Sequence, residues 1–151
     1  MPKPLLYLSA YFERNQNMYY DELFNVSKTG DWTPWLKYFL EGVEEQARDA
    51  LLRTRKVREL QEQYRTLLFY RRESGNTLSL LDHLFESPYL TAPTAAEFLE
   101  VTVAGARRIL ERLVEAGIVE VDTNSWPHNY IARNLLRVIE APTASEQTEA
   151  D

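Results

Sequence analysis

Side chains that commonly carry catalysis are few in this sequence. It has two histidines, His83 and His128, and no cysteine. The lack of cysteine excludes thiol catalysis, disulfides and cysteine-ligated zinc, and two histidines are too few for a histidine-rich metal site. The sequence has no glycine-rich phosphate loop and no nucleophile beside a base. We therefore predict no catalytic residue, no metal ligand and no cofactor for this chain alone, and a freestanding enzyme ranks lowest among its candidate functions.

Several arginines lie near residue 110, and arginine side chains commonly contact nucleic acid. If they lie on a helix, their outward side chains would read base edges in the major groove of DNA. The candidate DNA-binding residues are Thr102, Arg107, Arg108 and Arg112. However, residues 77–140 hold five arginines against nine acidic residues, and the whole chain has a formal net charge of −6. The several phosphate contacts that DNA binding needs are therefore hard to assemble.

Trp126 lies between a predicted turn at residues 123–125 and a predicted strand at residues 130–132. Exposed aromatic side chains favour protein interfaces. We therefore rank protein interaction or dimerisation of this segment ahead of DNA binding, which remains the alternative. Fold analogy alone does not decide between the two.

Three short helices are predicted to position these residues, after a boundary at residues 74–77, where glycine and asparagine favour the end of a helix. The second of the three opens with a capping box, in which the hydroxyl of Thr94 and the carboxylate of Glu97 satisfy each other's backbone amides. Thr102 caps the third helix. Gly117 suits the left-handed residue that ends it.

A β-hairpin is predicted to follow the helices. Residues 118–121 alternate between apolar and polar like a strand, residues 123–125 form a turn, and residues 130–132 return as a second strand. Residues 133–140 add a last helix. Three helices followed by a hairpin are the order of a winged helix-turn-helix.

The N-terminal half is predicted to be helical. Apolar residues between Leu5 and Val26 recur every three or four positions, which indicates amphipathic helices with a break near residues 15–17. Gly30 ends this segment. Thr33 precedes a proline and is predicted to be the N-cap of a new helix.

The new helix is predicted to run from Trp35 to about Arg72, because this stretch has no proline and a single glycine, Gly42. Its apolar side chains form a stripe on either side of a polar middle at residues 53–59. Residues 53–58 include several basic side chains, which can pair with nearby acidic residues. We interpret the middle as a solvated connector, with a break in the helix there.

The predicted domains are residues 1–73, which are helical, and residues 77–140. Residues 141–151 are small, polar and acidic, so they are predicted to be a disordered tail. No stretch reaches the roughly 18 apolar residues of a membrane-spanning helix, and the N-terminus has no signal-peptide pattern. We expect a cytoplasmic protein without a membrane partner.

The N-terminal half also resembles a known family in the order and spacing of its residues. Residues 4–68 resemble the helices that follow the active-site loop in bacterial Fic-domain (Fic/DOC family) proteins, and similar proteins continue into a winged helix. The matching residues are Pro4 to Ser9, Tyr11 to Asn15, Tyr19, Tyr20, Leu23, Gly30 to Trp32, Trp35, Leu36 and Phe39 to Val43. The resemblance implies a mainly α fold. In this fold the helical C-terminal part of a Fic domain is joined by a long helix to a small winged helix-turn-helix.

The resemblance implies a link to AMP transfer from ATP to hydroxyl side chains of target proteins. That chemistry uses ATP, Mg²⁺ and a loop with His-Pro-Phe followed by Gly-Asn-Gly-Arg. Neither His83 nor His128 is followed by proline, so the loop is absent from this sequence. We expect a non-catalytic regulatory or targeting segment, which is part of a longer chain, a split gene product or a natural truncation.

The partners implied are the missing catalytic core, in the same chain or on another, and a second copy in a homo-oligomer. An exposed apolar surface is then expected on residues 5–39, where the core would pack. By resemblance Tyr20 lines the adenine pocket, although packing of Tyr19 and Tyr20 against a neighbouring helix is the favoured interpretation. The alternative function is a stand-alone winged-helix transcriptional regulator, in which the long helix pairs two copies.

Overall fold

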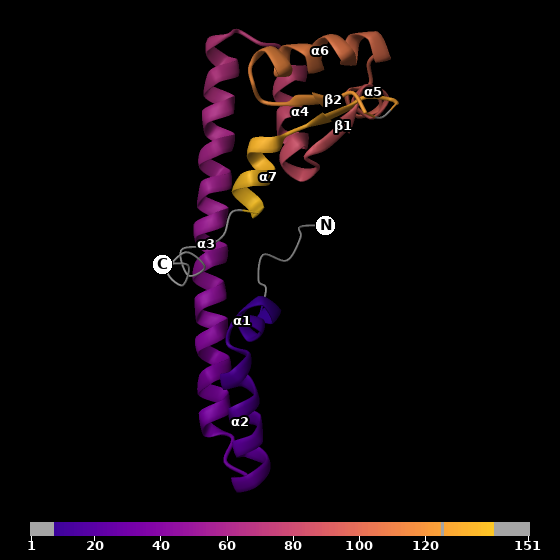
Figure 1. The fold of residues 1–151 in the computed structure, drawn as a ribbon. Coiled ribbons are helices and arrows are strands. Elements are labelled where there is room, and N and C mark those ends of the chain that lie inside the picture. Colours follow the sequence, from indigo (N-terminus) through magenta and orange to yellow (C-terminus); the bar gives the residue numbers. More distant parts are fainter. Residues whose placement is uncertain (1–7, 125, 141–151) are drawn as a thin grey trace. The chain divides into compact units, whose positions relative to one another are not determined.

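The computed structural model describes residues 8–124 and 126–140. Within these ranges the chain forms seven helices and a small antiparallel sheet of three strands, so the fold is mainly α, as predicted (Figure 1). The described residues divide into two compact units, one from residue 8 to Thr54 and one from Arg55 to residue 140. None of the described helices is both long and apolar enough to cross a membrane. Residues 1–7 and the predicted tail at 141–151 lie outside the described ranges.

The first unit holds α1 (Leu8–Arg14), α2 (Gln16–Thr29) and the start of α3 (Thr33–Tyr70). The break predicted near residue 15 is confirmed, because Asn15 separates α1 from α2. Gly30 ends α2 with a left-handed φ of 72°, and its N–H donates to the Val26 carbonyl. A residue with no Cβ adopts this conformation without strain.

The residue that caps the start of α3 is not the one predicted. The Asp31 carboxylate accepts the backbone N–H of Thr33 at 2.9 Å, and Thr33 is already the first residue of the helix. Hydrogen bonds from the backbone and side chain of Thr33 lower the pKa of Asp31. A carboxylate suits this place because it also interacts favourably with the helix dipole.

The predicted break in the polar middle of α3 is wrong, since the helix is uninterrupted to Tyr70.

Aromatic rings form the interior of the first unit. Tyr11 and Tyr38 are buried, with Tyr38 only 3% exposed, and their ring centroids are 5.4 Å apart. Phe12 packs on Tyr38 with a centroid separation of 6.0 Å. Rings at such distances attract one another beyond the effect of buried area. An ion pair of 3.0 Å between Arg14 and Glu45 also joins α1 to α3.

The second unit begins with the rest of α3, and its connection to α4 (Gly75–Glu86) differs from the prediction. Arg72 takes the left-handed conformation with a φ of 55°. Residues 75–76, which were predicted to end a helix, instead open α4. Ser74 is the N-cap, and its hydroxyl accepts the N–H of Thr77 at 3.4 Å. The serine cap decides where α4 starts, because it satisfies a backbone donor at the helix N-terminus.

Two short helices joined by a tight turn follow, α5 (Ala92–Leu99) and α6 (Val103–Glu115). Thr102 caps α6 as predicted, since its hydroxyl accepts the N–H of Gly105 at 3.1 Å. The predicted capping box at Thr94 is wrong. Thr91 is the cap of α5, and its hydroxyl accepts the N–H of Thr94 at 3.3 Å.

The sheet contains β1 (Tyr89–Thr91), β2 (Glu120–Asp122) and β3 (Asn129–Ile131). Its order is β1-β3-β2 with antiparallel pairing, and Tyr130 lies opposite Leu90 on one side and Val121 on the other. The hairpin of β2 and β3 was predicted, and so was the helix that follows it, α7 (Arg133–Glu140). The strand β1 was not predicted, because three residues beside a helix cap are too few for an alternating pattern.

A continuous apolar core holds α4, α5, α6 and the sheet together. Six leucines with no exposed surface lie at its centre: Leu68, Leu80, Leu81, Leu84, Leu110 and Leu113. Ala95 and Ala106 are also fully buried, and their small side chains let α5 and α6 pack closely. Burial of these residues fixes which side of α6 faces solvent.

Candidate interaction surfaces

The outer face of α6 carries two arginines without acidic partners. Ala106 and Leu110 turn one side of the helix into the core, which leaves Arg107 and Arg108 exposed on the other. Among the described residues, neither arginine forms an ion pair. Thr102 is also exposed, but its hydroxyl accepts the capping hydrogen bond of α6.

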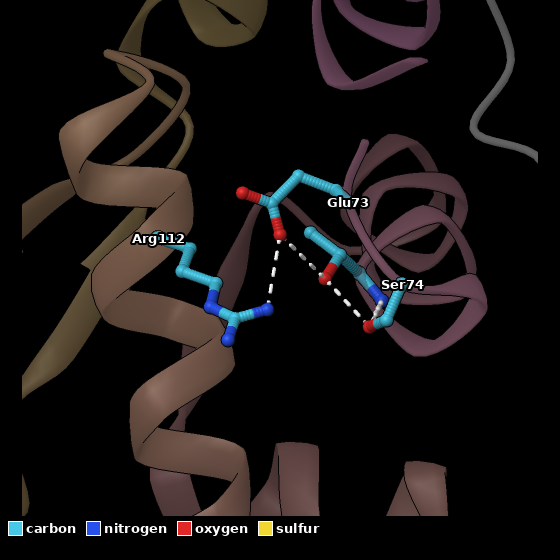
Figure 2. A network of polar contacts seen from close by, with 4 residues as sticks. Glu73, Ser74 and Arg112 are labelled. Carbon is cyan, nitrogen blue, oxygen red and sulfur yellow. Dashed lines mark hydrogen bonds and ion pairs between the residues drawn. The ribbon is translucent and has the colours of Figure 1, made fainter. Parts of the chain in front are cut away.

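Arg112, the fourth candidate for DNA contact, forms part of a polar network (Figure 2). Its Nη1 lies 3.2 Å from Oε2 of Glu73, whose side chain is 13% exposed. The same oxygen accepts a hydrogen bond of 3.5 Å from the hydroxyl of Thr77, which lies 3.0 Å from that of Ser74. Arg112 therefore ties α6 to the connection between α3 and α4. Arg112 comes five residues after Arg107, which places it about 140° around the helix axis from Arg107.

A groove of about 340 Å³ lies between the starts of α5 and α6 and the connection from β2 to β3. Its lining is formed by Ala92, Pro93, Val103, Arg107, Trp126, Pro127, His128 and Tyr130. Trp126 is 81% exposed, and its ring meets that of His128 edge-on with centroids 5.1 Å apart. The lining is mainly apolar, and Arg107 is its one arginine. Such a groove can bury an apolar group and hold an anion beside it.

Residues 123–132, which include the connection between β2 and β3, contain no lysine or arginine. Glu120 on β2 forms an ion pair with Nε of Arg133 at 2.8 Å. Asp122 accepts hydrogen bonds from the backbone and side-chain nitrogens of Asn124 at 3.0 and 2.8 Å. The connection therefore offers no lysine or arginine to a phosphate.

In the first unit, large apolar side chains are exposed on α2 and at the start of α3. Tyr20 and Phe24 lie one turn apart on α2, and the ammonium of Lys28 is 4.3 Å from the centroid of the Phe24 ring. Leu36 and Leu40 lie one turn apart on α3. The exposed side chains of this kind between residues 8 and 40 are Met18, Tyr20, Phe24, Trp32, Leu36 and Leu40. Exposed apolar side chains one turn apart lie on the same side of a helix, an arrangement typical of interaction surfaces.

The two adjacent tyrosines on α2 have different environments. Tyr19 is half-buried, and its ring centroid is 5.3 Å from that of Phe12. Tyr20 is 58% exposed and meets Tyr19 edge-on at 5.5 Å. The favoured interpretation, in which both tyrosines pack against a neighbouring helix, is therefore confirmed for Tyr19 and wrong for Tyr20, which is mostly exposed to solvent.

The two histidines lie in separate surroundings. His83 on α4 stacks on Phe98 of α5 with ring centroids 4.1 Å apart, and its Nδ1 is 3.9 Å from Oε2 of Glu86. His128 belongs to the groove lining. Among the described residues, no group of three His, Asp or Glu side chains is arranged to hold a metal ion.

Sequence patterns indicated Arg107 and Trp126 separately, but not the groove that joins them. Pro93 and Val103 were not predicted as site residues, because residues of these types are ordinary at helix starts. Their place in the groove depends on the pairing of β3 with both other strands, which brings the hairpin to the starts of α5 and α6.

No protein-family model matches this chain.

Proposed function

We propose that this chain is the non-catalytic regulatory and targeting segment of a Fic-type protein AMP-transferase, and that residues 8–54 dock onto its catalytic core. The observation that carries this proposal is the set of exposed apolar side chains on α2 and the start of α3. Tyr20, Trp32, Leu36 and Leu40 belong both to this set and to the Fic-like sequence pattern. Covering Trp32, Leu36 and Leu40 stabilises a complex by roughly 25 cal/mol per Å² of apolar surface buried.

In this proposal the two partners divide the chemistry. The catalytic core supplies the histidine base, the loop that holds the phosphates, and the site for ATP and Mg²⁺. This chain supplies one wall of the adenine pocket through the exposed ring of Tyr20, which can stack on a base. The chain by itself is expected to transfer no AMP, because the phosphate-holding loop is absent from its sequence.

Co-expression with a Fic domain whose own C-terminal helices have been deleted tests the docking. We expect a one-to-one complex by size-exclusion chromatography with light scattering, and transfer of labelled AMP only by the complex. Phe24→Glu and Leu36→Glu should abolish the complex, because each places a charge in the buried contact. Phe69→Glu is the matched control, since Phe69 is also exposed but belongs to the second unit. If no complex forms, or if Phe24→Glu binds as well as the parent chain, docking through this surface is wrong.

The same surface leads us to propose self-association when the catalytic core is absent. Light scattering of the chain alone should give the mass of a homo-oligomer, and Phe24→Glu should shift it to a monomer. A monodisperse monomer at high concentration would contradict this part of the proposal.

For the second unit we propose a winged helix-turn-helix at residues 77–140, with protein interaction or dimerisation as its role. The order α4, β1, α5, α6, β2 and β3 supports this assignment. The exposed Trp126 in the connection between β2 and β3 supports a protein partner, because tryptophan is enriched where interfaces bind most strongly.

DNA binding by the second unit is the second candidate, favoured by Arg107 and Arg108 on the outer face of α6. A mobility-shift assay against genomic fragments tests it. If this candidate holds, Arg107→Ala and Arg108→Ala each weaken binding and flatten its salt dependence. Binding that ignores both substitutions would count against recognition through α6.

A further inference from the structure

We propose that the groove beside α6 binds a peptide segment in which a large apolar side chain is flanked by acidic residues. The groove belongs to the second unit, so this inference rests on the protein-interaction role proposed for that unit and is independent of the docking of residues 8–54 onto a catalytic core. It has about 340 Å³ of volume, within the lower range of sites that hold small ligands. That size suits one inserted side chain with a short stretch of extended backbone.

The apolar half of the recognition comes from Trp126, Val103 and two prolines. Trp126 is 81% exposed, and Val103 is exposed beside it, although both are side chains that gain from burial. Pro93 and Pro127 form part of the same lining and donate no backbone N–H. An aliphatic or aromatic side chain placed here would bury apolar surface on both sides.

The acidic half of the recognition comes from Arg107. Arg107 lines the groove, and Arg108 follows it on the same exposed face of α6. Three other arginines of this unit pair with carboxylates: Arg65 with Asp82, Arg112 with Glu73, and Arg133 with Glu120. Among the described residues Arg107 and Arg108 form no such pair. A carboxylate on the peptide would complete a charge-assisted pair that this chain leaves open.

A peptide suits this site better than a nucleic acid does. A duplex needs several neutralised phosphates along its backbone, whereas a peptide needs one carboxylate at Arg107. Residues 123–132 contain no lysine or arginine, so the hairpin gives no cation to a backbone that would run past it.

Fluorescence anisotropy with labelled synthetic peptides tests the proposal on the full chain. The first peptide has one leucine with two glutamates on each side. In the three comparison peptides, glutamine replaces the glutamates, lysine replaces them, or alanine replaces the leucine. We expect saturable binding of the first peptide and losses of about tenfold or more for the others.

Variants of the chain locate the site. Trp126→Ala and Arg107→Ala should each weaken binding of the acidic peptide by about tenfold, whereas Arg58→Ala and Tyr70→Ala, exposed on α3, should not. Arg107→Glu should lose the acidic peptide and gain the lysine peptide, a reversal that misfolding cannot produce. The proposal is overturned by failure of every peptide to bind, by binding that ignores charge, or by a DNA duplex that binds more tightly through the same residues.

Discussion

The ring of Tyr11 lies directly against the backbone of Gly42. A Cβ at position 42 would be 2.5 Å from Cδ1 and 2.6 Å from Cε1 of that ring, closer than carbon atoms approach without strain. Gly42 therefore lets α1 pack against α3 with an aromatic ring as the contact. This explains a glycine in the interior of a helix, where it costs about 1 kcal/mol relative to alanine.

Gly42→Ala should destabilise the first unit in spite of its better helix propensity. Overpacking costs about 1–3 kcal/mol, which exceeds the gain in propensity. Hydrogen exchange of the amides in α1 and the start of α3 should accelerate. Gly75→Ala is the control, because a Cβ there meets nothing within 4 Å. Slower exchange in Gly42→Ala would show that the ring yields easily.

Tyr11→Phe should change how the first unit responds to alkaline pH. Burial, followed by the nearby carboxylates of Glu45 and Glu41, raises the pKa of Tyr11 above its ordinary value near 10. A raised pKa gives stability that is fully present below the unfolded value and is lost as pH rises through the folded value.

Stability of the parent chain should therefore fall above about pH 10, and the Tyr11→Phe variant should fall less. Hydrogen-exchange or urea-unfolding profiles between neutral and alkaline pH measure this. Tyr38→Phe provides a second case, since burial, with Tyr11 and Tyr19 nearby, also raises the pKa of Tyr38. Equal alkaline loss in the parent and in both variants would contradict the assignment.

Glu73 and Arg112 should behave as a coupled pair in the stability of the second unit. A double-mutant cycle with Glu73→Ala and Arg112→Ala should give a coupling of about 1 kcal/mol, because the pair is only partly exposed to solvent. Arg108→Ala, an exposed arginine on the same helix, should change the free energy of unfolding by less than about 0.5 kcal/mol. A coupling near zero would mean that Arg112 is available for other partners.

Thr91→Ala should destabilise the second unit more than Thr94→Ala. Thr91 accepts the N–H of Thr94, so its loss removes the N-cap of α5 at a cost of about 1 kcal/mol. Thr94→Ala removes only a hydrogen bond between the two hydroxyls and leaves the cap in place. Urea unfolding of the two variants measures the difference, and the opposite order would restore the capping box that the sequence pattern suggested.

The sequence by itself determined most of the helices and their ends, since these depend on nearby residues. Thr102 caps α6, Gly30 ends α2 and Gly117 takes a positive φ of 71° because hydroxyl acceptors and glycine act within a few positions. Apolar periodicity likewise predicted the three helices of the second unit and the hairpin. Where two local patterns competed, as at Thr91 and Thr94, sequence alone chose the wrong one.

Only the tertiary structure decided which residues meet across the chain. The strand β1 exists because Leu90 pairs with Tyr130, forty positions away, and no local pattern encodes that contact. Only the tertiary structure pairs Arg112 with Glu73 and brings Arg107 and Trp126 into one groove. Caps and periodicity depend on neighbours in sequence, whereas ion pairs, grooves and short strands depend on which distant residues the core brings together.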